Sequence, residues 1–138
     1  MESRKPKLIR EDIIYPELSY EIVGCAFEVF DALGPGHSEK TYQKAMAVAF
    51  RKRDIPFREQ AYYALIFLDE IVGKSFLDFE VDSKIVVELK KDGRYSKTNL
   101  EQVLDYLKKS KLKLAILINF SQDGVKFKRI VNINGSPA

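Results

Sequence analysis

Length, composition and charge place the chain among ordinary globular proteins. Its 138 residues suit one domain with a single core, and 46% of them are hydrophobic while 31% are charged. No apolar run approaches the roughly 20 residues of a membrane-spanning helix, and no secretory signal follows the basic N-terminal residues. We therefore expect a cytoplasmic protein without membrane contact. The formal net charge of +3 is too small to decide whether a partner is a polyanion.

The scarcity of cysteine and histidine limits the metal chemistry. The chain has one cysteine, Cys25, and one histidine, His37. An intrachain disulfide is therefore impossible, and a zinc site built from these ligands is excluded. A metal would instead be held by oxygen ligands, which is typical of Mg²⁺ or Mn²⁺.

The first part of the chain predicts two helices. Apolar residues recur every three or four positions between residues 16 and 33, which is typical of an amphipathic helix. The segment Gly34-Pro35-Gly36 ends this helix. Ser38 is the expected N-cap of a second helix, which ends before residue 54.

The remainder predicts a sheet interrupted by one helix. Aromatic and β-branched residues fill residues 57–88, and breaks near residues 69–73 and at Asp82-Ser83 divide them into three strands. A third helix is expected over residues 96–110. Two further strands, over residues 112–120 and 125–131, follow it and are joined by a turn.

The predicted fold class is α/β, a mixed sheet flanked by helices in the order ααβββαββ. The helix between the third and fourth strands requires these two strands to be parallel. One domain over residues 16–133 contains these elements. An irregular basic arm at residues 1–15 precedes it, and a tail at residues 134–138 follows it.

Three charged residues on the second and third predicted strands carry the candidate chemistry. Side chains alternate between the two faces of a strand, so Glu88 and Lys90 share a face. If the turn at Asp82-Ser83 pairs the two strands, Asp78 lies on that face too. Two carboxylates can hold a hard divalent cation, and a neighbouring lysine can orient water or stabilise negative charge during phosphodiester hydrolysis.

The competing interpretation is a solvated strand face whose charges pair across the sheet. An aspartate, a glutamate ten residues later and a lysine two residues beyond that arise often by chance. The spacing alone favours the solvated face, so the metal-site interpretation needs support from other motifs.

Several such motifs are present. The pattern of Asp78, Glu88 and Lys90 resembles the signature of the PD-(D/E)xK nuclease superfamily, and the predicted order of elements is similar to its common core. Residues 36–42, Gly-His-Ser-Glu-Lys-Thr-Tyr, resemble the motif that names the GxxExxY family, a small prokaryotic branch of that superfamily. The resemblance covers residues 18–131, and its other segments are residues 33–36, Gln102 with Tyr106-Leu107, residues 117–120 and residues 128–131.

The resemblance implies a metal-dependent nuclease with a restriction-endonuclease-like fold. It assigns Mg²⁺ or Mn²⁺ binding to Asp78 and Glu88, a further metal contact to the backbone carbonyl of Leu89, and catalytic assistance to Lys90. An acidic residue of the first core helix joins the site in many members, and Glu39 is its match. The proline of the motif is absent here, as it often is in the superfamily.

Glu39 and Gln102 each have two interpretations. Glu39 extends the apolar stripe of its helix toward the core, where a metal or Lys90 would pair with it. Alternatively, it is a first-turn carboxylate near the surface, favoured by the helix dipole. Gln102 lies off the apolar stripe of its helix, either on a solvated face or, as in several superfamily branches, in contact with the site.

Four residues are candidate substrate contacts. Tyr42 is expected to pack in the core with its hydroxyl reaching the cleft. Lys91 and Arg94 follow the Glu-x-Lys strand and can contact phosphates, although such a charged loop is usually solvated. Tyr106, on the third helix, is the fourth candidate.

The leading hypothesis for function is a nuclease that uses Mg²⁺ or Mn²⁺ to activate water and hydrolyse DNA rather than RNA. A second hypothesis is a non-catalytic module that binds nucleic acid on the same fold. A third is a regulatory component of a larger repair or defence system, because the short chain has no separate specificity domain. A homodimer or partner proteins would suit a chain of this size.

Overall fold

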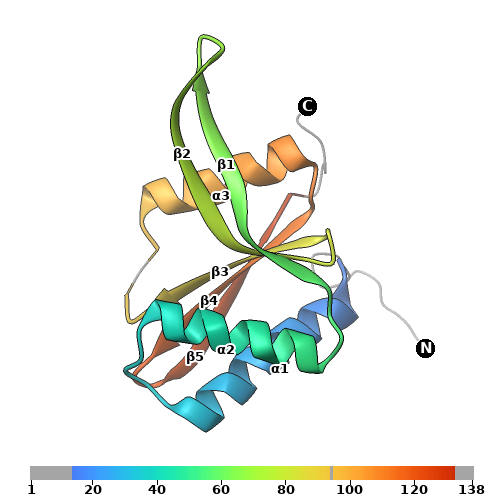
Figure 1. Cartoon of the computed structure of the whole chain (residues 1–138), viewed down its shortest axis with the longest axis vertical. Helices are drawn as coiled ribbons and strands as arrows, with labels where there is room; N and C mark the ends of the chain where they lie inside the picture. The colour runs from blue at the N-terminus through green and yellow to red at the C-terminus, as the bar shows by residue number, and fades with distance from the viewer. Residues whose placement is uncertain (1–13, 94, 133–138) are drawn as a thin grey trace, which may run out of the picture.

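The computed structural model describes residues 14–93 and 95–132, so Arg94, the predicted tail and most of the predicted arm lie outside it. Helices and strands follow one another in the predicted order (Figure 1). The α/β class, with a mixed sheet flanked by helices, is confirmed. The elements are α1 (Pro16–Leu33), α2 (Glu39–Lys52), β1 (Phe57–Phe67), β2 (Glu70–Val81), β3 (Ile85–Lys91), α3 (Lys97–Ser110), β4 (Leu114–Ser121) and β5 (Gly124–Val131).

The five strands form one sheet in chain order, β1-β2-β3-β4-β5. Neighbouring strands are antiparallel except for β3 and β4, which are parallel from Ile85 opposite Leu114 to Lys91 opposite Phe120. The predicted parallel pair is therefore confirmed. Its cause is the α3 crossover, which returns the chain to the end of the sheet where β3 began.

The helices cover the two faces of this sheet. Helices α1 and α2 lie on one face and α3 lies on the other (Figure 1). Alternate residues of β3 enter the two resulting cores, with Ile85, Val87 and Leu89 on the α1–α2 side and Val86 on the α3 side. β3 is thus buried on both faces, as expected of a central strand with a parallel neighbour. None of the described helices is both long and apolar enough to cross a membrane.

The first hairpin differs from its prediction in one respect. Gly73 does not break the chain: it lies inside β2, opposite Leu65 of β1. A shift of register between Leu65 and Ile66 absorbs the irregularity instead. A Cβ atom at Gly73 would lie 3.8 Å from the Leu65 side chain, an ordinary van der Waals contact, so cross-strand packing does not require glycine here.

The alternation of side chains along β1 and β2 reverses near Gln60 and Asp78. Phe79 packs on the α1–α2 side of the sheet, whereas Leu77, two residues away, packs on the α3 side. Gln60 is the residue that would pair with Asp78 if the β1–β2 ladder were continuous. This pair is missing from the ladder, and Gln60 has a positive φ of 56°. Strict alternation along the predicted second strand would place Leu77 and Phe79 on one face; this expectation is wrong, because the backbone turns between them.

Candidate active site

Strands β2 and β3 separate at Asp78 and Glu88. Their ladder pairs Val81 with Ile85 and extends to Phe79 opposite Val87, but not to the next pair. Beyond this point the β1–β2 hairpin bends away from β3 (Figure 1). We call this divergence the β2–β3 fork. Backbone groups on that edge of β3 lose their strand partner here and need another one.

Two carboxylates replace the missing ladder pair in the fork. The backbone N–H of Asp78 donates to Glu88 Oε1 at 2.7 Å, and the backbone N–H of Leu89 donates to Asp78 Oδ2 at 2.7 Å. Each acidic residue therefore fixes the strand that carries the other. This exchange brings the two carboxyl groups together even though alternation along β2 fails at Asp78.

Glu39 binds the same edge of β3 from helix α2. Its Oε2 accepts a hydrogen bond from the backbone N–H of Lys91 at 3.1 Å, and Figure 1 shows the end of β3 beside the start of α2. Ser38 is the N-cap of that helix, as predicted, because its side chain accepts from the backbone N–H of Thr41. Glu39 is an exposed first-turn residue, as in the surface interpretation, but its carboxylate is held against β3.

The backbone carbonyl of Leu89 faces the fork. In a strand, the N–H and C=O groups of one residue point to the same edge. Since the N–H of Leu89 reaches Asp78, its carbonyl points toward β2 as well. This oxygen therefore lies on the edge of β3 that Asp78 and Glu39 also bind.

The side chains alone do not form a complete metal cage. Within residues 14–93 and 95–132, no group of three or more His, Cys, Asp and Glu side chains is arranged to hold a metal ion. Each of Glu39, Asp78 and Glu88 has one carboxylate oxygen that accepts from a backbone N–H, and Asp78 and Glu88 are the two acids that share the fork. Further ligands would be backbone or water oxygens, and such an all-oxygen set fits Mg²⁺ or Mn²⁺.

The two carboxyl groups lie in a poorly solvated place, which disfavours their charged forms. Burial raises the pKa of Asp78, and the charge of Glu39 raises it further, while the N–H of Leu89 opposes the shift. Burial, followed by the charge of Asp78, raises the pKa of Glu88 to about 8. No salt bridge joins either carboxylate to a basic side chain in the described part of the chain. A bound cation would offset the free-energy cost of ionising these two buried carboxyl groups.

Lys90 follows Glu88 and Leu89 but does not pair with the carboxylates. It is half-buried near the end of β3, opposite Asn119, and its Cε lies 4.0 Å from the position of a Cβ atom at Gly93. The ammonium group makes no ion pair with Asp78 or Glu88 within the described residues. It is therefore not neutralised by the two acids beside it.

Two residues that sequence reasoning did not select also contact the site. Asn99 on α3 donates from Nδ2 to Glu88 Oε2 at 3.4 Å. The hydroxyl of Tyr95 lies 3.0 Å from the carbonyl oxygen of Glu88 and 2.9 Å from that of Ile118, so it spans β3 and β4. Tyr95 lies just before α3 and Asn99 lies in its first turn. Polar residues at the start of the helix that follows the Glu-x-Lys strand were the feature of the sequence that could have indicated them.

Tyr95→Phe is expected to lower the free energy of unfolding by about 1 kcal/mol, the usual cost of one lost internal hydrogen bond. The ring would remain in place while the two carbonyls lost their hydroxyl donor. Chemical denaturation measures the change. Tyr20→Phe is the control, because Tyr20 is 77% exposed, and an equal effect of both changes would contradict the role given to Tyr95.

Three other predicted residues are not brought to the carboxylates by their side-chain contacts. Tyr42 is fully buried, its ring stacks on Phe120 and its hydroxyl donates to the carbonyl oxygen of Gly34 at 2.7 Å, so it does not reach the cleft as expected. The hydroxyl of Tyr106 donates to Glu80 at 2.8 Å. Gln102 is half-buried, and its side chain makes no hydrogen bond to another described residue.

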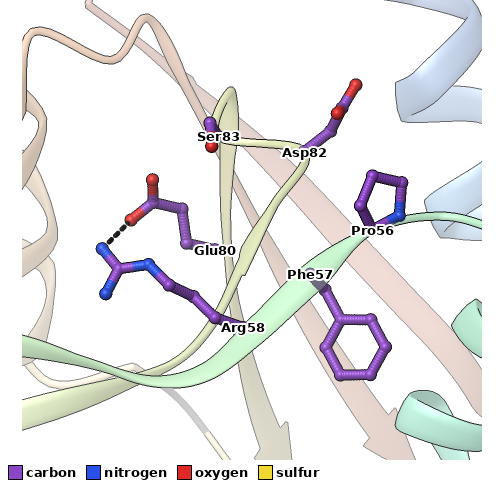
Figure 2. Close-up of a pocket in the computed structure, with 6 residues that line it drawn as sticks. All are labelled: Pro56, Phe57, Arg58, Glu80, Asp82 and Ser83. Atoms are coloured by element: carbon purple, nitrogen blue, oxygen red, sulfur yellow. Dashed lines mark hydrogen bonds and ion pairs between the residues drawn. The ribbon is translucent and has the colours of Figure 1, made fainter.

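A separate hollow of about 200 Å³ lies at the C-terminal end of β2, past the fork, and is lined by residues 56–58, Glu80 and residues 82–83 (Figure 2). Its two central charges neutralise each other, since Arg58 and Glu80 form an ion pair of 2.5 Å. Asp82 is paired with Lys84. This hollow lacks the unpaired buried carboxylates that distinguish the fork, so the candidate chemistry lies at the fork.

Comparison with known proteins agrees with this geometry. The family model described as the PD-(D/E)XK nuclease superfamily matches residues 16–130, which include all the described helices and strands except Val131, the last residue of β5. No curated protein and no solved structure gives a match. The matched span covers most of the 138 residues and contains the fork with both of its acids. The chain belongs to the PD-(D/E)XK nuclease superfamily.

Proposed function

We propose that this protein is a metal-dependent nuclease of the GxxExxY branch that hydrolyses phosphodiester bonds of DNA in the cytoplasm. The observation that carries the proposal is the buried pair Asp78 and Glu88, whose carboxylates cross-link two diverging strands without a cation among the described residues. A structural role alone would be met by neutral side chains, which could make the same hydrogen bonds without the cost of buried charge.

The proposed roles follow from the positions of the groups. Asp78, Glu88 and the carbonyl of Leu89 would hold Mg²⁺ or Mn²⁺. When bound, such a cation neutralises charge that develops on the phosphate and lowers the pKa of a water molecule. Lys90 would stabilise the additional negative charge of the transition state with its uncompensated ammonium group. Glu39 would hold the end of β3 and increase the negative potential at Asp78.

Four further residues have supporting roles in the proposal. Asn99 would orient Glu88 through the hydrogen bond to Oε2. Lys91 and Arg94, which follow the Glu-x-Lys strand, remain candidates for contact with DNA phosphates. Gln102 is a candidate for contact with the substrate backbone from α3.

One observation favours a second function, a non-catalytic module that binds nucleic acid. The described side chains do not form a group of three His, Cys, Asp or Glu residues that could hold a metal ion. Such a module would keep the fork as a structural joint and act with partner proteins. It would bind DNA without a requirement for Mg²⁺ or Mn²⁺.

A cleavage assay separates the two functions. We expect the purified protein to cut single-stranded, duplex or branched DNA with Mg²⁺ or Mn²⁺ and not with EDTA. Lys90→Ala is expected to reduce the rate at least about 100-fold, the scale of removing one group that stabilises transition-state charge. Lys84→Ala is the matched control, because Lys84 precedes the same strand but pairs with Asp82. Binding without cleavage would support the module, and RNA cleavage alone would contradict the DNA assignment.

A further inference from the structure

Two aromatic rings form an exposed pair on the β1–β2 hairpin, close to the fork. Tyr62 of β1 and Phe76 of β2 are cross-strand partners, and their ring centroids lie 5.6 Å apart with 57° between the ring planes. Tyr62 nevertheless stays 45% exposed and Phe76 stays 49% exposed. Each ring therefore supports the hairpin with one side and keeps a large apolar surface open to solvent. We call these two residues the aromatic pair.

The aromatic pair lies on the face of the sheet that carries α2. The next residues in sequence, Tyr63 and Leu77, pack into the core on the α3 side. Successive side chains of a strand point to opposite faces, so Tyr62 and Phe76 point away from α3. Phe76 precedes Asp78 by two residues, which is about 7 Å along a strand. The aromatic pair is thus next to the fork.

A groove with two lysines lies between α2 and the start of the hairpin. It has a volume of about 300 Å³ and is lined by Lys40, Gln43, Lys44, Glu59 and Gln60. Glu59 accepts a hydrogen bond from Gln43 at 3.2 Å, which ties β1 to α2. Lys40 and Lys44 are exposed, and neither forms an ion pair with another residue of the described ranges. The lysines outnumber the acid, so the groove favours an anionic ligand.

The groove and the aromatic pair adjoin one another at the fork. Gln60 lines the groove, precedes Tyr62 by two residues and occupies the break in the β1–β2 ladder beside Asp78. Lys74 precedes Phe76 by two residues and is exposed on the same face of β2. Lysines and open aromatic rings therefore lie along one face of the hairpin that begins at the fork.

This combination suits a single strand of nucleic acid. Its phosphates attract lysines, and its bases stack on exposed aromatic rings. In a duplex the faces of the bases are covered by their neighbours in the stack, so only an unpaired strand can present them to Tyr62 and Phe76. An apolar protein partner would use the two rings but not the lysines beside them.

We propose that this face of the hairpin binds single-stranded DNA and leads it to the fork. Bases would stack on Tyr62 and Phe76, while phosphates would contact Lys40 and Lys44 in the groove. The inference rests on the proposed function, since it takes the fork as the place of cleavage. It narrows the substrate to unpaired DNA, either a free single strand or the unpaired segment of a branched molecule.

Fluorescence anisotropy with labelled oligonucleotides tests the binding of bases. The measurements are made in EDTA, at one salt concentration, so that the DNA is not cut. We expect the native protein to bind a single strand at least about 5-fold more tightly than a duplex of the same length. A strand with several consecutive abasic sites keeps the phosphates and lacks the bases. Its binding should also be at least about 5-fold weaker, the effect of losing one base stack.

Substitution of the aromatic pair tests the assigned residues. Tyr62→Ala and Phe76→Ala are each expected to weaken binding of the single strand at least about 5-fold. Tyr62→Phe keeps the ring and should bind as the native protein does. Tyr20→Ala is the matched control, because Tyr20 is an exposed tyrosine of α1. Circular dichroism and the melting temperature establish that the variants fold.

The salt dependence of binding tests the groove. A phosphate contact to a single strand adds about 0.7 to the slope of log affinity against log salt concentration. Lys40→Ala and Lys44→Ala should each lower the slope by about this amount. Lys52→Ala should leave it unchanged, since Lys52 is an exposed lysine of the same helix that does not line the groove.

Three results would each overturn the inference: equal affinity for duplex and single strand, equal affinity for the abasic strand, or full affinity of both Tyr62→Ala and Phe76→Ala. None of these measurements requires cleavage. A protein that binds the single strand through the aromatic pair but cuts no DNA would therefore contradict the proposed function and support the binding surface. Undiminished cleavage of duplex DNA by Tyr62→Ala would do the reverse.

Discussion

Asp78→Asn is expected to reduce metal-dependent cleavage about 1,000-fold or more. Asparagine has nearly the same volume and retains an oxygen for the N–H of Leu89, so the fork should keep its shape. The variant removes one of the two charges that would hold the cation. A loss of several kcal/mol of transition-state stabilisation corresponds to a rate change of this size. Single-turnover cleavage with Mg²⁺ or Mn²⁺ measures it, and calorimetry with the metal alone measures the weakened binding.

Asp82→Asn is the matched control for this experiment. Asp82 lies four residues further along, in the turn after β2, and forms a surface pair with Lys84. Its substitution should leave both cleavage and metal affinity unchanged. Full activity of Asp78→Asn would contradict the assignment of the fork as the metal site, whatever the substrate.

Glu88→Gln is expected to raise the stability of the metal-free protein at neutral pH while it abolishes cleavage. Burial holds the pKa of Glu88 at about 8, above its ordinary 4.5. Between these values the folded state keeps a proton that the unfolded state releases, so stability falls as the pH rises through the window. Glutamine avoids this cost. Each unit of pKa shift corresponds to about 1.4 kcal/mol, and we expect a gain of at least about 1 kcal/mol.

Chemical denaturation at about pH 5 and about pH 8, in EDTA, measures this effect. The advantage of Glu88→Gln over the native protein should be small at the lower pH and grow at the higher one. Added Mg²⁺ or Mn²⁺ should narrow the difference by stabilising the native protein. Glu101→Gln, an exposed change on α3, should show neither behaviour. A destabilised Glu88→Gln at the higher pH would show that the charge of Glu88 stabilises the fold.

The sequence by itself predicted most of the local structure. Helix α1 has the bounds expected from its apolar repeat and its terminal glycine-proline segment, and Ser38 caps α2 as expected. The turn between β2 and β3 was also predicted, at Asp82-Ser83. Both residues have positive φ, a conformation that aspartate tolerates better than most residues. These features depend on neighbours within a few positions, where residue type and periodicity are strong signals.

The sequence also indicated which acids and which lysine to examine, and the family match covers all of them. It could not show how they meet. Strict alternation along β2 would have placed Leu77 and Phe79 together, but the positive φ of Gln60 accompanies a reversal of both strands beside Asp78. Such a reversal depends on where two strands diverge, and no residue pattern within one strand encodes that.

The tertiary structure alone decided the contacts made by each polar group. Tyr42 was expected to reach the cleft, yet stacking on Phe120 turns its hydroxyl toward Gly34. Glu39, ambiguous in sequence, binds the amide of Lys91 because the edge of β3 has lost its strand partner there. Asp78 binds the same edge at Leu89, and Glu88 binds the facing edge of β2 at the backbone N–H of Asp78, for the same reason. The sequence determined which charges are present, and the divergence of β2 from β3 determined which backbone groups they must satisfy.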